Sequence, residues 1–301
     1  MNTTETPRQT RRRFLREATL ATAAVGMFPF SSTAAVAPEE SSSGLVFGLV
    51  TDVHYADADT KGTRYYRDSR AKLAAAVEEF QRRKVAMVVE LGDLVNVGPS
   101  KEAELGYLET ICKVLEPLGV PKHFVLGNHC VDTLTKAEFL KGCGREAEPT
   151  YYSFDVGGYH FVVLDADFLQ DGTSYAPGNF QWTDTWIPKR EQAWLAEDLA
   201  RAKGRPAVVF VHQNLHDEKD AHGVKNAPEV RAILEASGDV IAVFQGHMHS
   251  GGFARLGGIP YCTLRAMVEG PGAENNAFAI VKIQGGKVEF KGFDKQRAWA
   301  F

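Results

Sequence analysis

Short motifs rich in metal-binding side chains follow the apolar segments of this chain. The run FGLV, for example, is followed by Asp52-Val-His54, and the run KHFVL by Gly127-Asn128-His129. The full set of candidate ligands is Asp52, His54, Asp93, Asn128, His212, His247 and His249. Apolar runs of this length are typical of buried strands. A chain with this pattern is therefore expected to fold so that several strand ends meet around one polar site.

The apolar runs alternate with segments of helical periodicity. Strands are predicted at 45–51, 85–91, 122–126, 159–165, 207–211, 240–244, 261–264, 277–283 and 287–292. Helices are predicted at 68–83, 101–116, 134–141, 188–202 and 228–236. This alternation indicates an α/β fold with a largely parallel sheet covered by helices. The helix-free stretch from Tyr261 onward predicts a second, more antiparallel sheet.

The spacing of the candidate ligands suits two neighbouring cations. Residues at i and i+2 of an extended backbone point to the same side, so Asp52 and His54 can face one metal ion. His247 and His249 have the same spacing, and the Asp93 carboxylate can bridge two ions. Histidine with carboxylate favours Mn, Zn or Fe over Mg or Ca. Two such ions can clamp an in-line displacement at phosphorus, with a metal-bridging hydroxide as the nucleophile.

The other histidines match no motif. Each motif alone is compatible with an ordinary turn at a strand end, and the ordered set carries the prediction. His123, His160, His216 and His222 are expected to be structural or on the surface, although His216 is near enough in sequence to line the cleft.

Taken together, the motifs resemble those of the calcineurin-like metallophosphoesterases. The resemblance runs from about Leu45 to the C-terminus and implies a four-layer αββα sandwich of two mixed sheets, with a dinuclear metal site at the C-terminal ends of the strands. By position, it implies one metal ion held by Asp52, His54, Asp93 and His249, and a second held by Asp93, Asn128, His212 and His247. It implies that His129 does not bind metal but contacts the phosphate and helps to stabilise or protonate the leaving oxygen.

Two positions depart from the family pattern. Cys130 stands where the family usually has an acid that orients the histidine, and Asp132 is the nearby substitute. Asn96 stands where purple acid phosphatases have a tyrosine, so we predict that the protein is not purple.

Substrate contacts are predicted in two segments. The block Arg64-Tyr65-Tyr66-Arg67 is similar to one in manganese-dependent ADP-ribose/CDP-alcohol diphosphatases. Its arginines could hold a second phosphate and its tyrosines could stack on a base or ribose. Alternatively, the block is the solvated edge of helix 68–83, with the tyrosines packed down. The aperiodic loop 168–187 offers Trp182 and Trp186 as substrate platforms, or is packed by its own aromatic side chains.

The N-terminus has the order of regions found in an export signal. Thr10-Arg-Arg-Arg-Phe-Leu-Arg16 resembles a twin-arginine motif, an apolar stretch follows, and Ala35-Val-Ala37 or Thr33-Ala-Ala35 offers a cleavage site. We expect a signal peptide at 1–37, a linker at 38–44 and one catalytic domain at 45–301. The expected partner is the twin-arginine export machinery, and the expected location is periplasmic or extracellular. The alternative is a disordered basic tail.

Net charge and hydropathy argue against two classes of protein, nucleic-acid-binding proteins and membrane-spanning proteins. The net charge is −4, and residues 1–37 hold five arginines and two glutamates, which leaves the remaining chain with −7. An acidic body gives no reason to expect nucleic-acid binding. No stretch approaches the ~20 apolar residues of a membrane span, so a stable span is not expected.

The four cysteines form no CxxC motif, which argues against a zinc ribbon or a thioredoxin-like site. In an oxidising compartment a Cys130–Cys143 bridge is possible, and buried free thiols are the alternative.

Three functions remain open at this point. The first is a hydrolase of a small phosphorylated substrate that cleaves phosphodiester or diphosphate bonds, which the Arg64–Arg67 block favours. The second is an exported phosphomonoesterase that scavenges phosphate. The third is a non-catalytic binding module on the same fold, although all seven ligand positions and His129 are filled.

Overall fold

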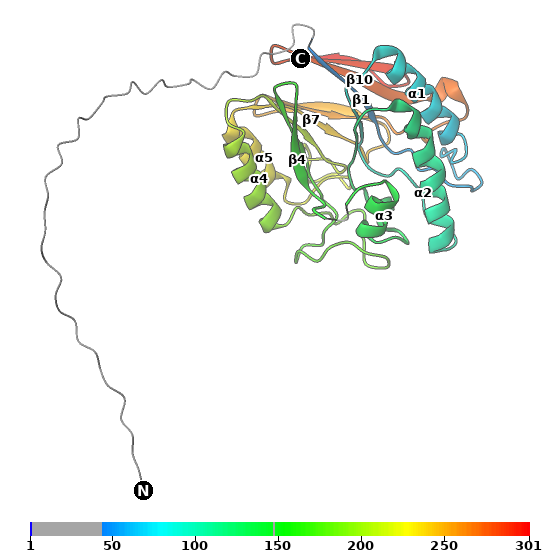
Figure 1. Ribbon diagram of the computed structural model, residues 1–301, viewed down its shortest axis with the longest axis horizontal. Coiled ribbons are helices and arrows are strands. Elements are labelled where there is room, and N and C mark those ends of the chain that lie inside the picture. Colours follow the sequence, from blue (N-terminus) through cyan, green and yellow to red (C-terminus); the bar gives the residue numbers. More distant parts are fainter. Residues whose placement is uncertain (2–43, 147) are drawn as a thin grey trace, which may run out of the picture. The chain divides into compact units, whose positions relative to one another are not determined.

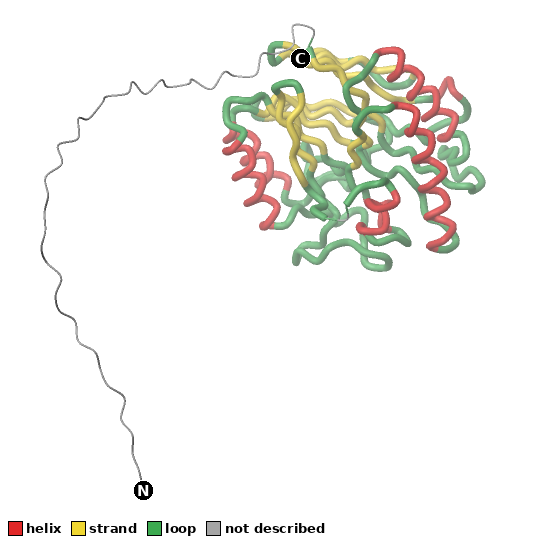
Figure 2. The backbone as a smooth tube through the Cα atoms, in the orientation of Figure 1, coloured by secondary structure: helices red, strands yellow, loops and turns green. Residues whose placement is uncertain are grey.

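The computed structural model describes residues 1, 44–146 and 148–301. The predicted signal peptide and nearly all of the linker lie outside the described residues. Two mixed sheets face each other in the described chain, and helices cover their outer faces (Figures 1 and 2). The predicted αββα sandwich is therefore confirmed. No helix among the described residues is long and apolar enough to cross a membrane.

The element bounds follow the sequence pattern closely. The strands are β1 (Leu45–Val50), β2 (Val88–Glu90), β3 (Lys122–Phe124), β4 (Tyr152–Val156), β5 (Tyr159–Val163), β6 (Ala207–Phe210), β7 (Val240–Gln245), β8 (Gly252–Leu256), β9 (Ile259–Thr263), β10 (Ala277–Gln284), β11 (Lys287–Asp294) and β12 (Trp299–Ala300). The helices are α1 (Ser69–Arg83), α2 (Lys101–Leu115), α3 (Lys136–Gly142), α4 (Lys189–Arg201) and α5 (Ala227–Ser237), with short 3₁₀ turns η1 (Glu116–Leu118), η2 (Asn128–Val131) and η3 (Ala273–Asn275). Strands β4, β8 and β12 were not predicted.

The sheets divide the chain differently from the prediction. One sheet has the order β12-β11-β10-β1-β2-β3 and the other β4-β5-β6-β7-β9-β8. The C-terminal strands therefore do not form a sheet of their own, and this prediction was wrong. Strand β10 pairs antiparallel with β1, from Leu45 opposite Ile283 to Leu49 opposite Ala279. Because β10 is apolar on both faces, a central position beside β1 buries both of them.

Side chains along β1 point alternately into two hydrophobic clusters. Phe47 and Leu49 point between the two sheets, where the Phe47 ring packs edge-on against the ring of Phe161 at a centroid distance of 5.7 Å. Val46 and Val50 point the other way, toward the cluster under α1 and α2. A strand with both faces buried reads as a continuous apolar run, which is what the sequence contains.

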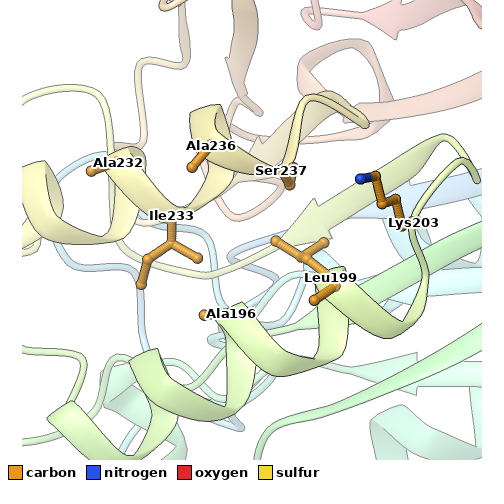
Figure 3. A pocket seen from close by; sticks show the side chains of 8 residues that line it. Ala196, Leu199, Lys203, Ala232, Ile233, Ala236 and Ser237 are labelled. Carbon is orange, nitrogen blue, oxygen red and sulfur yellow. The ribbon is translucent and has the colours of Figure 1, made fainter.

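The helices pack through the faces that the sequence predicts. In α1, four side chains at helical spacing are buried: Leu73, Ala76, Val77 and Phe80. On the other sheet, α4 and α5 leave an apolar groove of about 490 Å³ between them. Figure 3 shows side chains of both helices at this groove, including Leu199 and Ile233. None of the residues lining it belongs to the candidate ligand set.

Candidate metal centre

The strand ends bring the candidate ligands together. In one sheet, β1 is followed by Asp52 and His54, β2 by Asp93 and β3 by Asn128; in the other, β6 is followed by His212 and β7 by His247 and His249. Among the residues that the structure describes, three groups of side chains have ligand atoms within 4.8 Å of one another: Asp52 with His54 and His249, His54 with Asp93 and His129, and Asp93 with His212 and His247. The site is thus assembled from both sheets.

Asp93 lies between the two halves of the set. Its Oδ2 is 3.6 Å from His54 Nε2 on one side and 3.2 Å from His212 Nε2 on the other. Asp52 Oδ1 is similarly 3.6 Å from His54 Nε2 and 3.4 Å from His249 Nε2. Asp93 thus links two ligand clusters, one around His54 with Asp52 and His249 and the other around His212 with His247. Two clusters that share one carboxylate have the arrangement expected for a pair of bridged cations.

The hydrogen bonding of these side chains also fits metal ions. Buried polar groups are normally hydrogen-bonded, because an unpaired buried donor or acceptor costs free energy. Within the described chain, buried ligand atoms without any hydrogen-bond partner are Asp52 Oδ1, His54 Nδ1 and Nε2, Asn128 Oδ1, His212 Nε2 and His247 Nε2. These are oxygen and imidazole donors, which suit borderline divalent cations. The residues present therefore fit two metal ions.

The electrostatics of the cluster favour added positive charge. Burial alone would raise the pKa of Asp52, but the neighbouring His249 and His54 rings hold it well below its usual value. Burial would lower the pKa of His212, yet Asp93 raises it to about 10. In the same way, Asp52 and Glu269 raise the pKa of His249 to about 9 against the effect of burial. The acids thus stabilise positive charge in this site, whether protons or cations supply it.

Backbone conformation is unusual at four of the site residues. Asp52, His54, Asp93 and His247 have φ of 48°, 44°, 62° and 67°. Residues other than glycine seldom adopt this left-handed region. Gly92 (φ 105°) precedes Asp93, and a Cβ added there would clash with the His212 ring. The glycine in this motif therefore lets a strand end of one sheet approach a histidine of the other.

Partners outside the ligand set orient two of the histidines. His212 Nδ1 donates to the Leu91 carbonyl oxygen at 2.8 Å, which leaves Nε2 facing Asp93. His249 Nδ1 donates to Glu269 Oε1 at 2.6 Å, which leaves Nε2 facing Asp52. Such partners fix the tautomer and the ring orientation of a metal-binding histidine. The sequence prediction gave Glu269 no role, because no local spacing relates it to His249.

A buried ammonium group holds the segment that carries Glu269. Lys72 is 1% exposed, and its Nζ donates to the carbonyl oxygens of Met267, Glu269 and Gly270 at 2.9, 3.0 and 2.6 Å. Lys72 belongs to α1, so these bonds fasten the 267–270 segment to the helical layer. Met267 N also donates to the Thr51 carbonyl oxygen beside Asp52. Lys72 is therefore connected to His249 through the backbone that carries Glu269.

His129 stands at the mouth of the site with an acid behind it. Its Nδ1 donates to Asp132 Oδ2 at 2.5 Å, so Asp132 occupies the orienting role for which it was the predicted substitute. Its backbone N–H donates to Asp93 Oδ1 at 2.8 Å. Burial would lower the pKa of His129, but Asp93 and Asp132 raise it above its ordinary value. Cys130 is buried and accepts from the Gly127 N–H at 3.4 Å, away from this pair.

A cleft of about 540 Å³ opens above the ligands. Its lining consists of Thr63, Arg64, Asp93, Asn128, His129, Phe180, Trp182, His222, His247, His249 and Glu269. Trp182 lies at the cleft as predicted, with its ring centroid 5.8 Å from that of His247. Phe180 was not singled out by the sequence. His222 was expected to be structural or on the surface, but its ring centroid is 5.1 Å from that of His247, so that prediction is corrected.

The Arg64–Arg67 block contributes one side chain to this lining. The Arg67 guanidinium pairs with Asp57 and Asp59 at 2.5 and 2.8 Å outside the cleft, so the prediction that it holds a phosphate is corrected. Tyr66 is buried in a small apolar cluster, as the alternative reading expected, and cannot stack on a substrate. Tyr65 does not line the cleft, and its backbone N–H donates to the Val268 carbonyl oxygen. Arg64 remains as the substrate candidate of the block.

The other predicted contacts lie elsewhere. Trp186 does not line the cleft, and its Nε1 donates to Asp184 Oδ1. His216 also lies outside the lining, within 3.1 Å of Gln245 Nε2. His123 and His160 are structural as predicted, since His123 stacks on Phe154 and His160 bonds acids on two elements.

The arrangement of the cysteines differs from the predicted Cys130–Cys143 pairing. All four are free thiols, and the Sγ of Cys143 contacts Cys112 rather than Cys130, at 3.9 Å. The possible Cys130–Cys143 bridge is therefore replaced by the alternative of free thiols.

Known proteins share this sequence pattern and fold. The family model described as calcineurin-like phosphoesterase matches residues 45–251. The chain is 24% identical over 311 residues to a manganese-dependent ADP-ribose/CDP-alcohol diphosphatase of Xenopus tropicalis, covering 82% of this chain and 90% of the relative. It is 30% identical over 212 residues to the serine/threonine-protein phosphatase CPPED1 of Bos taurus, covering 67% and 66%. The crystal structure of a dimetal phosphatase from Danio rerio has the same fold, with a TM-score of 0.76 at 22% identity over 86% of this chain and 98% of that one.

Proposed function

The chain belongs to the calcineurin-like phosphoesterase family and is a metal-dependent phosphohydrolase. On that premise we propose that it cleaves phosphodiester or diphosphate bonds in the cleft above the ligand set. One observation carries the proposal: Arg64 lines the same cleft as the two ligand clusters that share Asp93. A guanidinium beside the metal-binding residues can hold a second phosphate while the first one reacts. A substrate with a single phosphate, whether a diester or a monoester, would leave Arg64 without such a partner, so this observation favours the diphosphate bond.

The residues of the chain have distinct roles in this reaction. Two cations bound by the ligand set would lower the pKa of a water molecule and neutralise charge on the phosphoryl oxygens. His129, held by Asp132, has its Nε2 free to donate a proton to the leaving oxygen. Its raised pKa favours the protonated form that this role requires. Trp182 and His222 border the cleft, where they can contact the organic group of a substrate.

Manganese is the metal that we propose for the site. A histidine, carboxylate and amide set accepts Mn, Zn or Fe, and availability as well as geometry decides among them. The choice of Mn is supported by the names of relatives such as the manganese-dependent diphosphatase of Xenopus tropicalis. Metal analysis of protein purified without chelators, followed by reloading of the chelated protein with each ion, tests this choice.

We also propose export of the folded chain through the twin-arginine machinery, supported by the order of basic, apolar and small-residue regions in residues 1–37. Replacing Arg11, Arg12 and Arg13 by Lys is expected to keep the protein in the cytoplasmic fraction. Equal amounts of the variant and the natural chain outside the cytoplasm would contradict the proposal.

The phosphomonoesterase and the binding module are tested by one substrate panel. We expect the Mn-loaded protein to hydrolyse bis-p-nitrophenyl phosphate and nucleoside diphosphate compounds faster than p-nitrophenyl phosphate. A clear preference for the monoester would instead support phosphate scavenging. The module would bind no metal ions and show no turnover across the panel, and the filled ligand positions argue against such a degenerate site.

A further inference from the structure

Two thiols from different helices meet behind the segment that carries His129. Cys112 lies near the end of α2, and Cys143 is the capping residue directly after the last residue of α3. Their sulfur atoms are 3.9 Å apart, and both residues are half-buried. In the part of the chain that the structure describes, this is the one thiol–thiol contact.

Packing along the whole α2–α3 interface sets this distance. At the other end of the interface, Lys101 Nζ pairs with Glu138 Oε1 at 2.8 Å, and Thr133 bonds the carboxylate of Glu104. Near the thiols, α3 approaches α2 so closely that a Cβ added to Gly142 would clash with a side-chain methyl of α2. The two helices are thus held at several points, and the sulfur atoms are neighbours in the folded chain.

The other two cysteines lack this arrangement. Cys130 is buried and accepts from the Gly127 N–H, whereas Cys262 is buried in β9 between the sheets. Any cross-link formed in the native protein is therefore expected to join Cys112 to Cys143 alone.

We propose that Cys112 and Cys143 are a site of reversible oxidation, at which a disulfide fastens α2 to α3. The two thiols lose two protons and two electrons as the sulfur–sulfur bond forms. A disulfide-containing oxidant such as oxidised glutathione takes them up and becomes two thiols. Forming the bond requires side-chain rotations that close the sulfur–sulfur separation from 3.9 Å to the ~2.0 Å of a disulfide.

The cross-link would enclose a functional part of the chain. The segment between the two cysteines contains β3, η2 and α3, and hence Asn128, His129 and Asp132. Closing a loop of this length restricts the unfolded chain and stabilises the folded one. The disulfide would therefore strengthen the region that presents the proposed acid, without touching the residues that bind metal.

Thiol counting and peptide mapping test the proposal. Purified metal-loaded protein is incubated with oxidised glutathione, denatured and titrated with a thiol reagent. We expect the count to fall from four free thiols to two. Trypsin without reduction is expected to release the peptide 102–113 joined to the peptide 142–145. The oxidised protein is expected to melt roughly 5–10 °C higher, an increase that a dithiol reductant removes.

Matched variants complete the test. Cys112→Ser and Cys143→Ser should each abolish the joined peptide and the rise in melting temperature, whereas Cys262→Ser should retain both. Retention of all four thiols after oxidation would overturn the proposal. It would also be overturned by a bridge that involves Cys130, or by one that forms no faster in the native protein than in concentrated denaturant.

Discussion

The floor and the rim of the cleft are built in different ways. The floor comprises the seven candidate metal ligands, which lie at strand ends and are buried except for the partly exposed His249. The rim comprises Arg64, Phe180, Trp182 and His222, which lie on loops between the strands and helices. Trp182 is 43% exposed, whereas Asp52 and His212 are fully buried. The same cleft therefore combines a rigid polar base with a border that the loops supply.

This difference separates two kinds of function. Strand ends in a packed sandwich hold side chains within narrow limits, which suits a metal centre. Loops tolerate change more readily, so the rim is where the substrate is expected to be selected. Substitutions in the floor should affect metal content and turnover together, and substitutions in the rim should affect substrate binding alone.

The largest effect is expected at the residue shared by the two clusters. Asp93→Asn removes the carboxylate that faces both His54 and His212, so at least one cation should be lost. We expect turnover to fall by more than about 1,000-fold, with a matching decrease in metal content by elemental analysis. Normal metal content with a normal rate would refute the shared-carboxylate arrangement.

The next effect separates proton transfer from metal binding. His129→Ala removes the proposed acid and leaves all seven ligands, so the rate should fall roughly 100- to 10,000-fold while metal content stays the same. The loss should be smaller for substrates with a good leaving group. His123→Ala, at a histidine that stacks on Phe154 outside the cleft, is the control. If the loss did not depend on the leaving group, His129 would not be the acid.

A smaller effect is expected at Lys72, which holds the Glu269 segment beside the floor of the cleft. Lys72→Met removes the ammonium group and leaves three carbonyl oxygens unpaired, which loosens the Glu269 segment behind His249. We expect metal affinity to fall about 10- to 100-fold, measured by competition with a chelator. The control on the same helix is Arg82→Met, an exposed residue paired with Glu79. Unchanged affinity would mean that Glu269 needs no anchor on α1.

In the rim, the two arginines of one block give a matched pair. Arg64→Gln should raise KM for a diphosphate substrate about 10-fold without changing metal content, since it removes a charge-assisted contact. Arg67→Gln should leave KM unchanged, because its guanidinium pairs with Asp57 and Asp59 outside the cleft. Equal effects of the two substitutions would remove the basis for a second phosphate site.

The smallest effect is expected at the exposed tryptophan. Trp182→Ala should raise KM for a nucleotide substrate roughly 3- to 10-fold, because an aromatic face in the cleft is lost. Trp186→Ala serves as the comparison, since this indole donates to Asp184 and does not line the cleft. A loss of metal ions from Trp182→Ala would show that floor and rim are not independent.

The floor could be predicted from the sequence because each part of it has a local signal. An apolar run followed at once by a polar ligand identifies a strand end, and the order of the motifs along the chain predicts the metal site. Asp132 could also be proposed, since it lies three residues from His129 on the same short turn.

The rim and the outer partners depend on long-range folding. Glu269 meets His249 only because β9 pairs with β7 and the chain then returns past the end of β1. Phe180 lies in an aperiodic loop that packs around Tyr175, whose hydroxyl lies within hydrogen-bond distance of two carbonyl oxygens of that loop. The misassigned C-terminal sheet has the same origin, because no local pattern states that β10 pairs with β1.

The left-handed backbone at the ligands has a consequence for mutational scanning. At His54 and His247, glycine relieves a conformation that a side chain disfavours. A scan scored by the abundance of metal-free protein would rank glycine well at these positions, whereas a scan scored by turnover would rank it among the worst. Positions where two such maps diverge mark selection for activity against selection for folding. The positions that form the floor of this cleft could therefore be identified from that divergence without knowledge of the metal or the substrate.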